Sequence, residues 1–356
     1  MKSRKSLVRN VIILVVSLIF LTGGGACLYA DHLLGSIHFV AAESGESEAS
    51  TGELFEPAAA SSEATSAKSG LVGGLCHDDA VTNILLLGAD DYQKNDVGRS
   101  DSMMLVSIDN RRGKLKTTSF LRDLYLAEPG IGNYKLTEAY SRGGGKDKGA
   151  RKVVATIEAN FGADIDRFVI VDYQAFPQII DRLGGVEIEL TNETNSRGIT
   201  EAGLINAYSG ETGRRAYVGK NLLTGKQARY YSRIREIGND YERSARQRKV
   251  FASLVAKLKT SNAAQLNSVI ADTLPLVTTN MTKNEVLSLA SHALSYLSYP
   301  VSECRVPANG EFRESEKDEI MLNGYNYSVL IPDLAKCKQT LLKFVYEDRI
   351  PTGEYS

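Results

Sequence analysis

The chain has 356 residues, of which 43% are hydrophobic and 24% charged, and its formal net charge is −1. This composition is typical of a globular protein that is long enough to bury a sizeable core. It excludes a general nucleic-acid binder, because no basic excess is available to neutralise a phosphate backbone.

The first predicted element is a transmembrane helix over residues 11–30, a stretch without charged side chains and long enough to cross a bilayer. Basic residues precede it, and the next one after it is Lys68. This asymmetry predicts a cytoplasmic tail over residues 1–10, a single pass through the cell membrane and an extracellular body. A cleaved signal peptide is the alternative, although the apolar stretch is long for one.

Residues 40–75 are rich in Ser, Ala, Glu and Gly, a composition that cannot bury enough apolar surface to fold. We therefore expect a flexible acidic linker over residues 31–77 and one folded domain over residues 78–356. An extracellular location permits a disulfide between Cys304 and Cys337, although sequence alone cannot fix the pairing.

Apolar runs in the folded part predict strands at residues 81–87, 103–108, 115–120, 168–171 and 186–190. Helical patterns cover residues 150–159 and 175–183, and Gly184-Gly185 ends the second. Strands that alternate with helices predict an α/β sheet covered on both faces.

Gly143-Gly144-Gly145-Lys146 is similar to a phosphate-binding loop, but Asp147 follows where Ser or Thr is required. We interpret this segment as a mobile loop and not as a nucleotide site.

A longer helix is predicted from Asn239, which forms a capping-box pattern with Glu242. Arg243 and Gln247 lie on the stripe that continues as apolar residues further along this helix. The positive end of the helix dipole also favours an anion at its first turns.

Two polar clusters bracket the domain. The first holds Asp90, Gly98-Arg99-Ser100-Asp101 and Leu121-Arg122-Asp123, and the second holds Arg233, Arg235, Asp240, Arg243, Arg246 and Gln247. Guanidinium groups suit phosphate, whereas a solvated charged helix face is the ordinary alternative. Carboxylates among the arginines predict an anion site that also holds a cation. Asp90 and Asp101, at strand ends, are the expected ligands of Mg²⁺, which prefers carboxylates together with phosphate oxygens.

The four histidines lie outside both clusters, so mechanisms of the Ser-His-Asp and Cys-His types are poorly supported. Phosphoryl transfer remains, since positioning and charge neutralisation provide most of its catalysis.

These motifs resemble those of the LytR-CpsA-Psr family. The segments Phe161–Phe168 and Asp181–Val186 and the single N-terminal membrane helix also resemble it, and the likeness covers roughly residues 83–256. The resemblance implies a central mixed sheet flanked by helices that enclose an apolar pocket for a polyprenyl tail. It also implies a membrane-bound phosphotransferase that moves an anionic glycopolymer, of teichoic acid or capsule type, from a polyprenyl-diphosphate carrier to peptidoglycan.

Residue by residue, the resemblance implies that Asp90 and Asp101 hold Mg²⁺ and that Asp240 orients the arginines or assists proton transfer. It implies a set of diphosphate ligands: Arg99, Arg122, Lys135, Arg233, Arg235, Arg243 and Gln247. Asp123 is expected to be the base for the acceptor hydroxyl, or else to pair with a neighbouring arginine. The chain departs from the family pattern at Leu121, where Pro is common, and at Thr137, where Asn is common.

Two other functions use the same residues. A polyprenyl-pyrophosphate hydrolase would need the same in-line geometry with water as the acceptor. A polyprenyl-lipid-binding regulator of the envelope would need the pocket without catalysis, yet paired carboxylates beside the arginines exceed what lipid binding requires.

Overall fold

The computed structural model describes residues 37–40, 69–90, 97–172, 174–238, 242–243, 245–247, 249–250, 253, 277–292, 295–296 and 299–349. The predicted membrane helix and most of the predicted linker lie outside these residues. Within the described ranges, no helix combines the length and the hydrophobicity needed to cross a bilayer.

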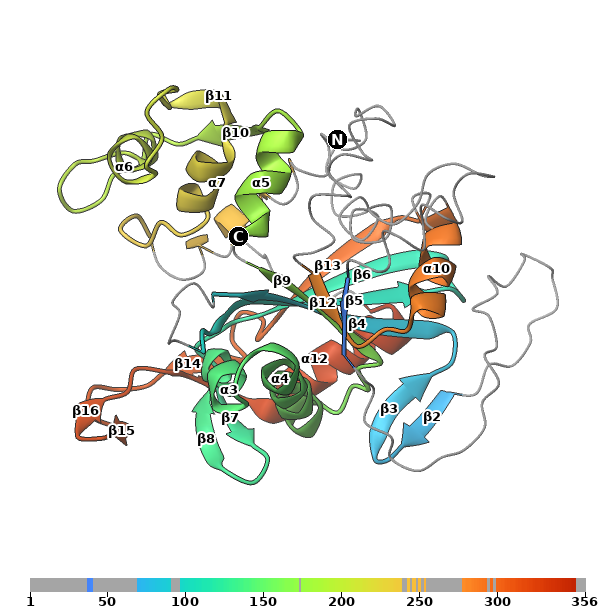
Figure 1. The fold of residues 1–356 in the computed structure, drawn as a ribbon. Helices are drawn as coiled ribbons and strands as arrows, with labels where there is room; N and C mark the ends of the chain where they lie inside the picture. The colour runs from blue at the N-terminus through green and yellow to red at the C-terminus, as the bar shows by residue number, and fades with distance from the viewer. Residues whose placement is uncertain are drawn as a thin grey trace.

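A seven-stranded mixed sheet forms the centre of the fold, in the order β1-β12-β9-β4-β5-β6-β13 (Figure 1). Its strands are β1 (His38–Phe39), β4 (Val81–Ala89), β5 (Ser100–Asp109), β6 (Lys114–Phe120), β9 (Arg167–Asp172), β12 (Val277–Thr279) and β13 (Val301–Val306). β4 pairs antiparallel with β5 and parallel with β9. The expected strands and the mixed α/β sheet are therefore confirmed.

The other strands form two-stranded ribbons. They are β2 (Ser69–Val72) with β3 (Leu75–Asp78), β7 (Tyr125–Glu128) with β8 (Gly132–Lys135), β10 (Val186–Leu190) with β11 (Gly219–Leu223), β14 (Phe312–Glu314) with β17 (Leu330–Pro332), and β15 (Met321–Leu322) with β16 (Tyr325–Asn326). The helices with defined bounds are α3 (Leu136–Arg142), α4 (Lys146–Phe161), α5 (Ala175–Arg182), α6 (Glu201–Tyr208), α7 (Gly225–Tyr231), α10 (Lys283–Ser291) and α12 (Leu334–Glu347).

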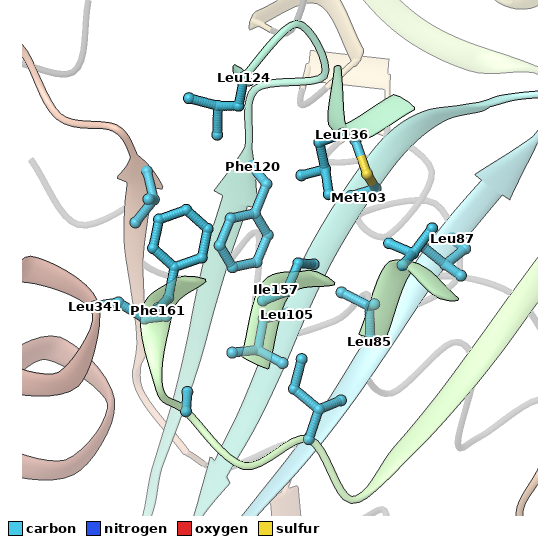
Figure 2. Close-up of a cluster of buried hydrophobic side chains, with 14 of the residues drawn as sticks. Leu85, Leu87, Met103, Leu105, Phe120, Leu124, Leu136, Ile157, Phe161 and Leu341 are labelled. Atoms are coloured by element: carbon cyan, nitrogen blue, oxygen red, sulfur yellow. The ribbon is translucent and has the colours of Figure 1, made fainter. Parts of the chain in front are cut away.

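Helices cover both faces of the sheet because the strands β4, β5 and β9 carry apolar side chains on both sides. Along β4, Leu85 and Leu87 pack with α3, α4 and α12, and Figure 2 shows this cluster. Ile84 on the same strand faces the other way, toward a core built from α5, α6, α7 and the β10–β11 ribbon. The result is a layered α-β-α arrangement, as predicted, with α5 and α7 on one side of the sheet and α4 and α12 on the other (Figure 1).

Part of the predicted linker is folded. β1 pairs parallel with β12 at the edge of the main sheet, and the β2–β3 ribbon lies directly before β4. The main chain of Cys76 on β3 bridges to Ala163, with Cys76 N donating to the Gly162 carbonyl over 2.8 Å. Residues 37–40 and 69–77 thus belong to the fold, because short backbone pairings can order a segment whose composition predicts no core.

Two further expectations are wrong. Gly143–Gly145, expected to be a mobile loop, is a hydrogen-bonded turn between α3 and α4, since its amides donate to carbonyls of residues 139–141. Cys304 and Cys337 are both buried, but each is a free thiol. Their Sγ atoms contact different main-chain carbonyls, those of Arg305 and Glu311 respectively.

A buried ion pair ties the sheet to α12. Lys116 on β6 is 0% exposed, and its Nζ donates to Asp109 Oδ2 over 2.8 Å and to the Val345 carbonyl over 2.7 Å. Burial alone would raise the pKa of Asp109, but Lys116 and Arg112 hold that pKa below its ordinary value. The stability that this pair contributes is therefore present above the pKa of an unfolded Asp, about 4, and is lost as the pH falls below it.

We expect Lys116→Met to lower the free energy of unfolding by about 3–5 kcal/mol, because it leaves the buried Asp109 carboxylate without its ammonium partner. Urea unfolding at pH 7 measures the change. The double variant Lys116→Met with Asp109→Leu should recover part of the loss, and an equal loss in both variants would contradict this account.

Candidate functional site

A cavity of about 230 Å³ opens where β4 ends and β5 begins. Its inner wall is apolar and comes from the sheet and from α5, with Leu86, Met104, Phe120, Val171 and Phe176 among its residues. Its mouth is polar and carries Asp90, Asp101, Arg122, Arg233, Arg235, Arg243 and Gln247. Residues from both predicted clusters, more than 100 positions apart in the sequence, therefore meet at one opening.

A β-bulge presents Asp101 to this mouth. Gly88 pairs with Ser102 and Ala89 pairs with Ser100, which leaves Asp101 as an extra residue on β5. Such bulges redirect a side chain at the end of a ladder. A Cβ added to Gly88 would lie 3.2 Å from the Ser102 Cβ, so the close pairing at the bulge favours glycine. Asp90 follows one residue later, and its amide donates to the Arg99 carbonyl over 2.9 Å.

Arg122 lies in the turn between β6 and β7 and holds two carboxylates. Its Nη1 donates to Asp101 Oδ1 over 2.7 Å, and its Nε lies 3.3 Å from Asp123 Oδ2. Lys135 Nζ lies 3.3 Å from the other Asp123 oxygen. Asp123 and Lys135 do not line the cavity, so they form a layer behind Arg122. The ion-pair alternative for Asp123 is the one that these contacts support.

Thr137, one of the two departures from the family pattern, supports the same turn. Its amide donates to the Arg122 carbonyl over 2.9 Å, and its hydroxyl donates to the Ser100 carbonyl over 3.0 Å. Thr137 thus links the Arg122 turn, through its amide, to the start of β5, through its hydroxyl.

Arg233 and Arg235 follow α7 in a turn, where the amides of Arg233 and Ile234 donate to the carbonyls of Tyr230 and Tyr231. Ile234 between them is buried, and both arginines are exposed and line the mouth. Arg233 Nη2 donates to Asp90 Oδ2 over 3.1 Å, and Arg235 Nη2 lies 3.9 Å from Asp101 Oδ2.

Arg246 has a structural role that its place in the predicted anion cluster did not reveal. It is 3% exposed, and its Nε donates to Glu201 Oε1 over 2.6 Å. Its remaining nitrogens donate to the carbonyls of Ile234 and Ile237. Arg246 thus fixes the segment that carries Arg233 and Arg235, while Arg243 and Gln247 reach the cavity.

The mouth carries more positive than negative charge, since four arginines surround two carboxylates. Burial would raise the pKa of Asp101, but Arg122, Arg243 and Arg235 hold it below its ordinary value. Asp101 is therefore ionised at neutral pH. Arg243 is 2% exposed whereas the Arg235 side chain is 54% exposed, so guanidinium groups extend from the interior to the solvent.

The structure does not bring every expected residue to the cavity. Arg99 is exposed and does not line it, and Asp240 lies outside the described residues. Sequence reasoning missed four other lining residues: Ser102, Met103, Ser119 and Ser232. The strand-end positions of the first three were the available signal, because neighbouring strand ends meet at one side of a sheet, whereas Ser232 caps the end of α7.

Asp90 and Asp101 suit a magnesium ion in the chemistry of their donors. Both present carboxylate oxygens to the same mouth, and Asp101 is held ionised. Because arginines outnumber these carboxylates, a cation would need phosphate oxygens of a bound substrate to complete its coordination.

Comparison with known proteins shows the family and the fold of the chain. The sequence model of the LytR_cpsA_psr family matches residues 44–343. A polyisoprenyl-teichoic acid–peptidoglycan teichoic acid transferase, TagU of Bacillus mycoides, is 29% identical over 64% of this chain and 69% of its own length. TagV of Bacillus subtilis, which has the same description, is 30% identical over 58% of this chain and 51% of its own length.

Solved structures share the fold. B. subtilis TagV superposes with a TM-score of 0.55 and 25% identity, covering 76% of this chain and 98% of that chain. A TagT structure with bound octaprenyl pyrophosphate lipid has a TM-score of 0.52 and 21% identity, covering 75% of this chain and 91% of that chain. With the family match spanning most of its length, this chain belongs to the LytR-CpsA-Psr family.

Proposed function

We propose that this protein is a phosphotransferase that moves an anionic glycopolymer from a polyprenyl-diphosphate carrier to peptidoglycan. The observation that carries the proposal is one cavity with an apolar wall and an arginine-rich mouth. A polyprenyl diphosphate has the matching form, an apolar chain ending in a doubly anionic head. The transferase names of the TagU and TagV relatives and the lipid bound to TagT support the same substrate.

In this reaction, an acceptor hydroxyl of peptidoglycan attacks the phosphorus that bears the glycopolymer. A new P–O bond forms to the acceptor, the bond from that phosphorus to the bridging oxygen breaks, and polyprenyl phosphate leaves. The acceptor proton passes to a base or to water. Arg122, Arg233 and Arg235 would hold the diphosphate in line, since each offers a planar fork of donors.

Asp90 and Asp101 would hold Mg²⁺, which when bound would neutralise charge on the diphosphate oxygens. Asp123 would keep Arg122 in position through their ion pair. As a member of this family the protein would act at the outer face of the membrane, with residues 11–30 as its anchor and residues 78–356 as the extracellular catalytic part.

An assay with purified protein tests the proposal and separates it from the two alternatives. It uses a polyprenyl-diphosphate-linked glycan as donor and peptidoglycan as acceptor, and it measures released polyprenyl phosphate and joined glycan. We expect equal amounts of the two products, with release dependent on acceptor. Release at the same rate without acceptor would indicate a hydrolase, and tight lipid binding without release would indicate a binding protein.

Filling the apolar wall tests the lipid part separately. We expect Val171→Trp to weaken binding of a long-chain polyprenyl diphosphate about tenfold or more, because apolar contacts worth about 0.8 kcal/mol per methylene would be lost. Inorganic pyrophosphate should bind as it does to the wild type. Val218→Trp, at a position 53% exposed and away from the cavity lining, is the matched control. Unchanged lipid affinity in Val171→Trp would show that the chain does not enter this cavity.

A further inference from the structure

A second cluster of ligating side chains lies at the other end of the central strands. His77 is on β3, just before β4, and Asp164 and Asp166 directly precede β9. β4 and β9 are parallel, so their first residues lie at the same end of the strands, and the cavity lies at the opposite end. The nine residues of β4 separate the two ends by roughly 25–30 Å.

Backbone pairing places these side chains together. Cys76 N donates to the Gly162 carbonyl over 2.8 Å, and Asp164 N donates to the Cys76 carbonyl over 3.1 Å. This bridge sets the His77 ring beside Asp164, with Nδ1 2.8 Å from Asp164 Oδ2. Asp166 is oriented independently, because its Oδ2 accepts the amide of Asn83 over 2.7 Å.

The three residues have the arrangement of a metal-ligand set. One atom from each of His77, Asp164 and Asp166 lies within 4.8 Å of the other two. Ligands of one first-row ion lie about 3–4 Å apart at bond lengths of about 2.0–2.2 Å. Side-chain shifts on the order of 1 Å would therefore close the set, and a main-chain donor already orients the Asp166 carboxylate, as outer-shell partners do in metal sites.

The charge balance of this cluster is opposite to that of the cavity mouth. Glu158 on α4 is a third carboxyl group here, and its Oε1 accepts the amide of Ile165, between the two aspartates, over 3.0 Å. Asp79 is a fourth carboxyl group, and its Oδ1 lies 3.0 Å from His77 Nε2. The nearby guanidinium of Arg167 is bound to Glu285. Four carboxyl groups thus lie around two basic groups, His77 and Arg167, and a bound divalent ion would offset this excess.

We propose that His77, Asp164 and Asp166 form a second metal site, for a divalent first-row transition ion bound through one imidazole nitrogen and two carboxylate oxygens. The mixed nitrogen and oxygen donors fit such an ion better than Mg²⁺ or Ca²⁺, which prefer oxygen alone. The ion would join β3 to the segment between α4 and β9, and so attach the start of the folded domain to its sheet. All three side chains are partly exposed, which leaves room for water ligands.

The test is binding of Mn²⁺ to full-length protein from which metal ions have been removed with a chelator. No diphosphate is added, because a cation at the cavity mouth would need its oxygens. Titration followed by the electron paramagnetic resonance of free Mn²⁺ should show one bound ion per chain, with a rise in the melting temperature. Asp164→Asn and His77→Gln should each weaken binding about tenfold or more, as loss of a ligand or of its orienting partner does. Asp164→Asn keeps the shape of the side chain, so a folded variant is expected.

Asp101→Asn is the matched control, because it alters the cavity mouth and leaves the second cluster intact. It should bind Mn²⁺ as the wild type does. Absence of Mn²⁺ binding to the wild type would show that His77 and Asp164 form only an ion pair. Binding that survives Asp164→Asn but disappears in Asp101→Asn would place the ion at the cavity instead. None of these outcomes depends on the transferase activity.

Discussion

Arg122→Lys is expected to lower kcat/KM for the transfer reaction about 100-fold, although the positive charge is kept. The Arg122 guanidinium binds Asp101 through Nη1 and approaches Asp123 through Nε, so two carboxylates fix one planar group at the cavity mouth. A lysine ammonium is a point charge and cannot make both contacts while facing a diphosphate. Breaking a desolvated charged contact costs about 2–5 kcal/mol, and about 1.4 kcal/mol is a factor of ten.

Arg99→Lys is the matched control. Both arginines were expected to bind diphosphate, but Arg99 is exposed and absent from the cavity lining. We expect its replacement to change kcat/KM less than threefold, within the range of about 0–1 kcal/mol typical of exposed charged contacts. Equal losses in the two variants would contradict the placement of Arg122 as the inner ligand.

The sequence was sufficient to predict the layered fold because the strands β4, β5 and β9 carry apolar side chains on both sides. Apolar runs such as residues 81–87 and 103–108 favour buried strands. In the structure, β4 contains the first run and β5 contains the second. The ribbon β2–β3 was missed for the opposite reason. Its backbone pairings, including that of Cys76 with Ala163, leave no hydrophobic periodicity to detect.

Helical spacing predicted part of the site correctly. Arg243 and Gln247 share a stripe, and both line the cavity. Arg246 belongs to the same charged segment, but its partner Glu201 lies 45 positions earlier, on α6. Composition cannot distinguish an arginine that binds a ligand from one that binds a distant carboxylate and two carbonyls. Sequence motifs have the same limit at Arg99 and Asp101, which lie in one motif. Asp101 lines the mouth, at the bulge opposite Gly88, and Arg99 does not.

Asp101→Asn should separate binding from catalysis. The substitution preserves the shape of the side chain and removes one negative charge from a site where Arg122, Arg235 and Arg243 all act on it. Anion binding should therefore be unchanged or tighter, since the arginines remain. We expect kcat to fall about 10²–10³-fold, the usual effect of losing one preorganised charge at a reacting group. A calorimetric titration with polyprenyl diphosphate and the coupled product assay measure the two quantities independently.

The same variant decides whether the negative charge at Asp101 acts through a metal ion. Wild-type activity should disappear with EDTA and return with Mg²⁺, and Asp101→Asn should need a higher Mg²⁺ concentration for its remaining activity. Asp123→Asn is the control, because Asp123 lies behind Arg122 and outside the cavity lining, and its Mg²⁺ requirement should match that of the wild type. Because the pKa of Asp101 is held below its ordinary value, this carboxylate stays charged at every pH above about 4. A loss of activity between pH 7 and pH 5 must then arise from another group. Full wild-type activity in the presence of EDTA would contradict a role for the metal ion and leave charge neutralisation to the arginines alone.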